Sequence, residues 1–333
     1  MSPTIRWRTD KEEKRMRTAL TERFDLTVPV VGAPMAGAAG GELAAAISAA
    51  GALGMIGAAG SATPAWIAEQ ARVAAAGGRP WGIGLLAWAL TDNPAQLDAV
   101  AELAPPLVSV SFGPYERHVE RLKQAGSAVA TQVGTVAEAR DAERAGVDLI
   151  VARGGEGGGH GRNDVATLPL LQAVLDHVGL PVLAAGGIAS GRGVAAVLAA
   201  GAAGAWVGTA FLACPEATVT PAARDRIVAA AETDTNYGRV FDVGMRQAWP
   251  PQYGGRALRN PFFEHWQGRE PELAGDDRAH ADLLAAVERH DFDTAYIYAG
   301  QSVGLIRRPR PAAEVVAELA TADDLLRRAS SPA

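Results

Sequence analysis

Eight short apolar stretches recur along the first two thirds of the chain, and each is followed by an alanine-rich segment with charges at helical spacing. The stretches cover residues 28–33, 53–57, 81–86, 107–112, 128–133, 148–152, 181–185 and 205–208. Apolar strands that alternate with helices are typical of a parallel sheet buried on both faces. Eight such units predict a closed (β/α)8 TIM barrel, since open doubly wound sheets usually have fewer strands.

The alternation stops after Phe211. Residues 215–300 hold helical pieces and a polar, aromatic-bearing stretch, which predicts a helical cap inserted after strand eight. The segment 311–330 has the apolar spacing of an amphipathic helix. We therefore expect a barrel over residues 1–214, a substrate-covering cap over 215–300, and a C-terminal part over 301–333 that returns to the barrel.

Composition excludes several classes of protein. The chain has 333 residues and a net charge of −6, without the basic face that nucleic-acid binding needs. Cys214 is the single cysteine, so neither an intrachain disulfide nor a cysteine-rich metal site is expected. The N-terminus is charged and the apolar runs are shorter than the ~20 residues of a membrane span. We expect a cytoplasmic protein with a small-molecule partner and no metal or membrane contact; a homodimer is one open option.

Two neighbouring strand ends carry small residues that can surround an anion. Gly186 and Gly187 follow the seventh strand, and Gly208 and Thr209 follow the eighth. Barrels often bind phosphate through backbone N–H groups at these two loops; the alternative is tight turns without a ligand. The run 191–196 matches a loose dinucleotide pattern, but its glycines come after the turn, and no acidic residue ends the next strand.

Six glycines surround His160 in the segment 153–162, at the end of the sixth strand. Glycine loses the most backbone entropy on folding, so this run makes sense where the backbone approaches a flat ligand. Histidine titrates near neutrality and is the commonest general acid or base. We predict a catalytic role for His160; the alternative is a surface loop with an incidental histidine. At the end of strand one, Pro34 fits a strand terminus and Met35 offers an apolar surface to an aromatic ring.

Together these residues resemble the nitronate monooxygenase family, formerly called 2-nitropropane dioxygenase. The similarity runs from about residue 24 to residue 325. Its markers are Ala33-Pro-Met-Ala-Gly37, the loop Gly154–His160, Ala184-Ala-Gly-Gly-Ile188, Val207-Gly-Thr209 and Tyr298-Ala-Gly-Gln-Ser302.

The resemblance implies an FMN-dependent (β/α)8 barrel that uses O2 to convert a nitronate or nitroalkane into a carbonyl compound and nitrite. His160 would face the substrate beside the flavin, either removing the α-proton or donating a hydrogen bond to the nitro group. Strand-end residues would bind the phosphate, the ring and its polar edge. The implied cofactor-binding residues are Ala33, Pro34, Met35, Gly84, Gln132, Arg153, Gly158, Gly186, Gly187, Trp206, Val207, Gly208, Thr209 and Gln301.

The chain departs from the family pattern at two positions. Arg153 stands where the family usually has glutamine, and we expect it to place a positive charge near the flavin pyrimidine or the nitro group. Gly84 stands where asparagine is common, and we expect it to leave extra room there and to remove a hydrogen-bond partner.

Three alternatives share this barrel. A flavin-dependent enoyl reductase has a similar histidine loop but uses NAD(P)H. An IMP-dehydrogenase-like enzyme needs a nucleophilic cysteine after strand six, whereas Cys214 follows strand eight. A barrel kept as a non-catalytic binding module is the third.

Overall fold

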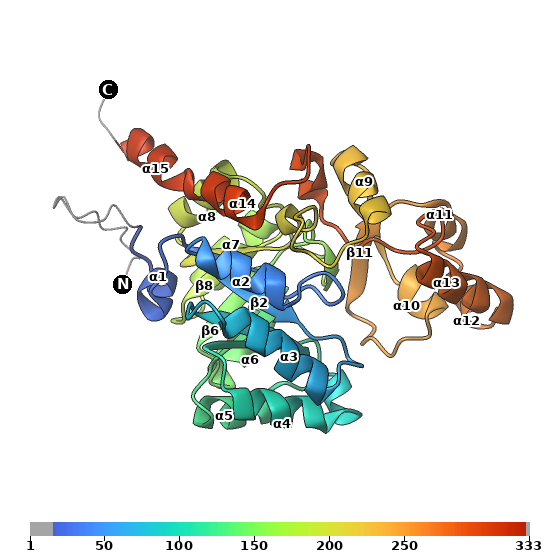
Figure 1. Cartoon of the computed structure of the whole chain (residues 1–333), viewed down its shortest axis with the longest axis horizontal. Helices are drawn as coiled ribbons and strands as arrows, with labels where there is room; N and C mark the ends of the chain where they lie inside the picture. Colours follow the sequence, from blue (N-terminus) through green and yellow to red (C-terminus); the bar gives the residue numbers. More distant parts are fainter. Residues whose placement is uncertain (1–15, 331–333) are drawn as a thin grey trace.

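The predicted barrel is confirmed in a computed structural model, which describes residues 16–330. Eight parallel strands close into a ring, and β1 pairs with β9 so that Val31 lies opposite Trp206 (Figure 1). The barrel strands are β1 (Val30–Gly32), β2 (Leu53–Gly57), β3 (Trp81–Leu86), β4 (Leu107–Ser111), β5 (Ala128–Val133), β6 (Leu149–Arg153), β8 (Val182–Ala185) and β9 (Gly204–Val207).

Helices surround the ring, and several begin at a side chain that caps them. Thr63, Thr135 and Ser190 each accept a hydrogen bond from the backbone N–H three residues on, which satisfies a group that the helix itself leaves unpaired. The surrounding helices are α2 (Gly41–Ala49), α3 (Pro64–Ala75), α4 (Pro94–Leu103), α5 (Glu116–Gln124), α6 (Val136–Arg144), α7 (Thr167–Leu175) and α8 (Gly191–Ala199).

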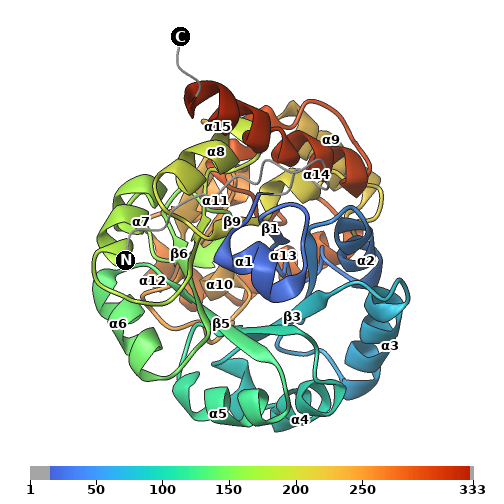
Figure 2. The same cartoon turned by 90° about the vertical axis from the view of Figure 1, so that its left-hand side faces the viewer.

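One end of the barrel is closed by α1 (Ala19–Phe24), which lies over its centre in Figure 2. Leu20 and Phe24 belong to the same apolar cluster as Val31, Leu53 and other residues of the barrel interior. Helix α1 thus covers the amino ends of the strands. A site within the barrel must therefore open at the carboxyl ends.

A small antiparallel sheet stands over those carboxyl ends. It joins β7 (Gly159–Gly161) to β11 (Gly254–Leu258), and β11 to β10 (Thr235–Gly238). The sequence predicted only helices in the cap and a loop around His160. Strand patterns depend on alternating side chains, and the glycines in β7 and β11 have none to alternate.

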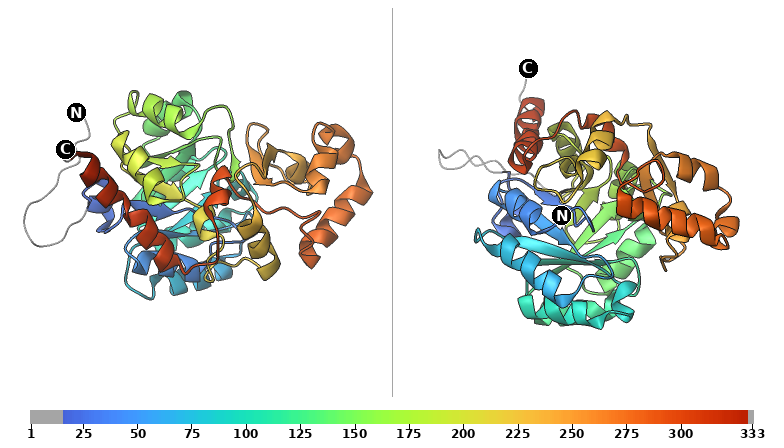
Figure 3. Two further views of the ribbon diagram at one scale, coloured as in Figure 1. Left: turned by 90° about the horizontal axis from the view of Figure 1, so that it is seen from above. Right: turned by 45° about the vertical axis from the view of Figure 1, so that its right-hand side comes forward.

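The rest of the cap projects away from the barrel (Figure 3). Val240, Phe241, Phe263 and Leu283 form its apolar core. Its helices are α9 (Pro221–Ala229), α10 (Val240–Gly244), α11 (Pro261–Trp266), α12 (Glu270–Ala274) and α13 (Asp277–Arg289). The cap boundaries at residues 214 and 300 stay a prediction.

The chain then returns to the outside of the barrel through α14 (Ala312–Ala320) and α15 (Ala322–Ser330). α14 contacts α2 and α8, and α15 contacts α8. Residues 1–15 of the predicted barrel segment and 331–333 of the C-terminal part lie outside the described residues. Within residues 16–330, none of the helices has the length and apolar character needed to cross a bilayer.

Candidate active site

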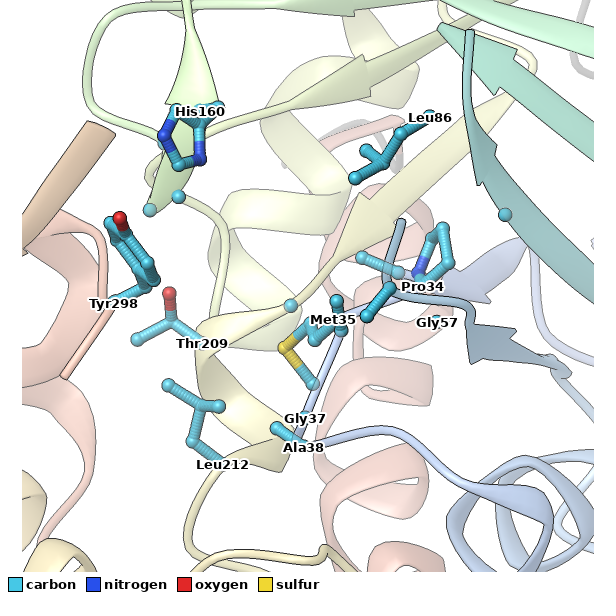
Figure 4. A pocket seen from close by; sticks show the side chains of 18 of the residues that line it. Pro34, Met35, Gly37, Ala38, Gly57, Leu86, His160, Thr209, Leu212 and Tyr298 are labelled. Carbon is cyan, nitrogen blue, oxygen red and sulfur yellow. The ribbon is translucent and has the colours of Figure 1, made fainter. Parts of the chain in front are cut away.

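A cavity of about 840 Å³ opens at the carboxyl ends of the strands, between the barrel and the cap (Figure 4). Most of the site residues predicted from the sequence line it, including His160. They are Ala33, Pro34, Met35, Gly84, Gln132, Arg153, Gly158, His160, Gly186, Gly187, Trp206, Gly208 and Thr209.

Val207 and Gln301 do not line the cavity. Val207 is buried in the layer between strands and helices, as expected because strand neighbours point to opposite faces. The Gln301 side chain is exposed. Its backbone N–H instead donates to the Glu156 carbonyl at 3.0 Å, which attaches this segment to the glycine loop.

The turn between β8 and α8 has the form of an anion cradle. Gly186 and Gly187 both have positive φ, at 108° and 71°, where other residues are strained. Within residues 16–330 the backbone N–H groups of Gly187 and Ile188 donate no hydrogen bond, and both residues line the cavity. Across the cradle, the Thr209 hydroxyl accepts a hydrogen bond from the Gly300 N–H at 3.0 Å. Two free donors therefore lie at one end of the cavity.

The floor of the cavity is built by close backbone packing around Pro34 and Met35. A Cβ on Gly57 would lie 2.3 Å from the Met35 carbonyl carbon, so only glycine lets the chain pass there. A Cβ on Gly84 would lie 2.4 Å from Cγ of Pro34. The expectation that Gly84 leaves extra room is wrong, because the proline ring fills that space.

We therefore expect the Gly84→Asn variant, which restores the family residue, to be less stable. The clash with Pro34 should lower the free energy of unfolding by about 1–3 kcal/mol, as overpacking usually does; urea denaturation measures it. The matched control introduces Gly84→Asn into a Pro34→Gly background, because both Cγ and Cβ of Pro34 would lie within 2.5 Å of the new Cβ. In that background Gly84→Asn should cost less than half of what it costs in the wild-type protein. Unchanged stability of the single variant would contradict this packing account.

Arg153 is buried and uses its guanidinium to hold the glycine loop together. Its two terminal nitrogens donate to the carbonyl oxygens of Gly157, Gly158, Gly159 and Arg162, at 2.6 to 3.2 Å. Within residues 16–330 it forms no ion pair, and burial lowers its pKa to about 10. Arg153 lines the cavity, and four loop carbonyls accept hydrogen bonds from its terminal nitrogens. A positive charge near the flavin pyrimidine or the nitro group stays a prediction.

His160 lies on β7 and is paired with an acid from the cap. Its Nε2 is 2.7 Å from Oδ1 of Asp242, and the two side chains are 8% and 1% exposed. A carboxylate accepts only, so the neutral histidine carries its proton on Nε2 and leaves Nδ1 as an acceptor. Nδ1 forms no hydrogen bond within the described chain. The pair therefore presents a histidine of fixed tautomer to the cavity.

Two aromatic residues hold the His160 ring in place. Trp249 stacks on it with centroids 3.5 Å apart and planes 3° from parallel. The Tyr298 ring lies 5.0 Å away on another side, and its hydroxyl points toward His160 (Figure 4). Burial, followed by the charge of Asp242 and a hydrogen bond to that carboxylate, raises the Tyr298 pKa well above its usual value. The protonated Tyr298 hydroxyl therefore lies beside both members of the His160–Asp242 pair.

The end of β4 adds a strained aromatic residue to the same wall. Phe112 has a φ of 68°, a left-handed conformation that is uncommon for a bulky side chain. Its ring packs edge-on against Trp249 and Tyr253, with centroids 5.4 and 5.3 Å away. Strain of this kind is often stored beside functional sites, and here it supports the ring that stacks on His160.

Sequence reasoning missed Asp242, Trp249 and the position of Tyr298 beside His160. One signal was available: Asp242 is a lone acid within the apolar run Val240–Val243, and a buried acid on an apolar helix needs a partner. Nothing in the sequence linked it to a histidine 82 positions earlier.

Comparison with known proteins identifies one family model that covers most of the chain. The family model described as nitronate monooxygenase matches residues 88–322. A curated relative from Rhodococcus jostii, (3aS,4S,5R,7aS)-5-hydroxy-7a-methyl-1-oxo-octahydro-1H-indene-4-carboxyl-CoA dehydrogenase, is 36% identical over 230 residues, which cover 68% of this chain and 64% of the relative.

Two solved structures are similar over nearly the whole chain, each at 30% identity. FabK from Thermotoga maritima has a TM-score of 0.83 and covers 94% of this chain and 98% of its own. Nitroalkane oxidase from Streptomyces ansochromogenes has a TM-score of 0.80, with coverages of 94% and 100%.

Proposed function

This chain belongs to the nitronate monooxygenase family, and we propose that it is an FMN-dependent enzyme that oxidises nitronates with O2 to a carbonyl compound and nitrite. The observation that carries this proposal is that His160, paired with Asp242, lines the same cavity as the glycine cradle.

The cavity residues fit FMN. The free N–H groups of Gly187 and Ile188 suit a phosphate dianion at a turn that leads into a helix. Pro34 and Met35 offer an apolar surface to the flavin ring. Gln132 has amide donors and an acceptor for the polar ring edge. When bound, FMN supplies the electron transfer between substrate and oxygen.

The chain's own residues orient the substrate and handle its proton. A nitronate has a planar anionic head, and the protonated Tyr298 hydroxyl would turn from Asp242 to donate to it. For a neutral nitroalkane, His160 Nδ1 is placed to take the α-proton, and Asp242 then stabilises the resulting imidazolium. Trp249 restricts the ring to this orientation, so little reorganisation is needed on binding.

A second candidate function is the dehydrogenation of an acyl thioester. It is favoured by the size of the cavity and by the carboxyl-CoA dehydrogenase name of the Rhodococcus relative. The α-proton of a thioester is also removed as a carbon acid, so the same histidine would serve.

Anaerobic mixing separates these functions. We expect a small nitronate to bleach the flavin absorbance of the holoenzyme, while NADH and a saturated acyl-CoA leave it unchanged. Bleaching by NADH alone would instead favour an NAD(P)H-dependent reductase, and bleaching by the acyl-CoA alone would favour the dehydrogenase. A purified protein without flavin absorbance that takes up no added FMN would point to a non-catalytic module.

A further inference from the structure

The cavity continues beyond the histidine side into an apolar wall that the proposed chemistry does not use. Its residues come from the end of β1, from the segment after β9, from α9 and from the segment after α13, and they pack in one cluster. We call this wall the apolar lobe; its members, all of which line the cavity, are Ala38, Leu212, Val219, Ile227 and Ile297.

The lobe lies apart from the catalytic side chains but in the same space. In Figure 4, Ala38 and Leu212 lie below His160 and Tyr298. Ligand pockets usually span about 300–1,000 Å³, and this cavity of about 840 Å³ includes both the space assigned to FMN and the apolar lobe. A contiguous apolar surface beside a reaction site indicates a ligand that covers it.

The charges around the cavity constrain what that ligand is. Among the described residues that line it, Arg153 and Asp92 are the only side chains of the lysine, arginine, aspartate and glutamate types. Arg153 already donates to four loop carbonyls, and Asp92 is exposed. His290 also lines the cavity but is exposed. A charged group buried among the lobe residues would therefore have no buried partner of opposite charge, which is costly. The occupant is therefore uncharged and apolar.

We propose that the substrate carries an apolar body, either an alkyl chain of several carbons or a ring, that lies in the apolar lobe while its reacting head lies beside His160 and Tyr298. This inference rests on the proposed function and narrows its substrate class. Small nitroalkanes are then poor stand-ins for the substrate, because they leave the lobe unfilled.

The first test uses the wild-type holoenzyme and redox-inert ligands. Straight-chain carboxylates have a planar anionic head like that of a nitronate, and their binding can be followed through the flavin absorbance spectrum. From butanoate to octanoate, Kd should fall about threefold per added methylene, because each buried CH2 contributes a roughly constant increment. KM for the matching nitronates should fall in parallel.

The second test fills the lobe. Val219 is half-buried and lines the cavity, so Val219→Phe should raise Kd for octanoate at least tenfold and change Kd for butanoate less than threefold. The matched control is Val228→Phe, because Val228 packs against the same cluster without lining the cavity. If Val219→Phe is insoluble, Ala223→Leu on α9 replaces it.

Two results would overturn the proposal: a Kd that does not change with chain length, or a Val219→Phe protein that loses FMN rather than octanoate, which would assign the lobe to the cofactor. The proposed function fails separately, if no nitronate of any length reduces the flavin. In that case the carboxylate series still reports whether the lobe binds an apolar chain.

Discussion

The Asp242→Asn enzyme should lose about 100-fold or more in kcat/KM for a neutral nitroalkane and less than about tenfold for the corresponding nitronate. General acid–base catalysis typically contributes about 10²–10⁴-fold, and it is needed only when the α-proton is still present. The amide can donate to Nε2, which moves the histidine proton to Nδ1 and removes the acceptor that faces the cavity. Steady-state kinetics with a nitroalkane and with its own nitronate measures the two losses in kcat/KM.

His160→Asn is the reference for this comparison, since it removes the imidazole itself. We expect it to retain FMN and to show the same preference for the nitronate, with a loss for the nitroalkane at least as large. The pH dependence of kcat/KM gives a further readout, because a purely structural defect would not change its shape. Equal losses for both substrate forms in Asp242→Asn would contradict the assignment of Asp242 as the residue that positions His160.

Placing a negative charge in the cradle should release the cofactor. Gly187 has a φ of 71°, and a Cβ there would meet nothing closer than 3.7 Å. Aspartate tolerates this conformation better than most residues, so Gly187→Asp should fold. Its carboxylate would repel the phosphate dianion, and we expect FMN affinity to fall roughly 100-fold, about 2.7 kcal/mol, as measured by fluorescence titration of the flavin-free protein.

Gly187→Asn is the matched control, because it has the same shape and backbone preference without the charge. It should lose much less affinity than the aspartate variant, and the gap between the two should narrow at high salt. Similar losses in both variants would mean that space rather than charge decides binding at this turn.

The barrel and its cradle could be predicted because they depend on patterns local in sequence. Alternating apolar and helical segments determine the order of the strands, and parallel strands bring their carboxyl ends to one edge. Gly187 and Thr209 come within two residues of the ends of β8 and β9, so their approach follows from the topology. The apolar stretches 107–112 and 181–185 predict β4 and β8 to within about a residue at each end.

The remaining features depend on contacts between distant segments. Asp242 reaches His160 only because β11 pairs with β7 and carries the cap over the barrel. The sequence suggested free space at Gly84, because the Pro34 ring that fills this space follows a different strand, β1. The hydrogen bonds from Arg153 to the carbonyls of its own loop were not predicted either. Individual residue types do not reveal such partners.

Titration of the flavin-stripped protein with FMN and with riboflavin tests the central claim most directly, because the two ligands differ only in the phosphate assigned to the cradle. We predict that FMN restores a bound-flavin spectrum and binds at least about 100-fold more tightly than riboflavin, a difference of about 2.7 kcal/mol. Equal affinity for the two ligands, or no binding of either, would contradict the account.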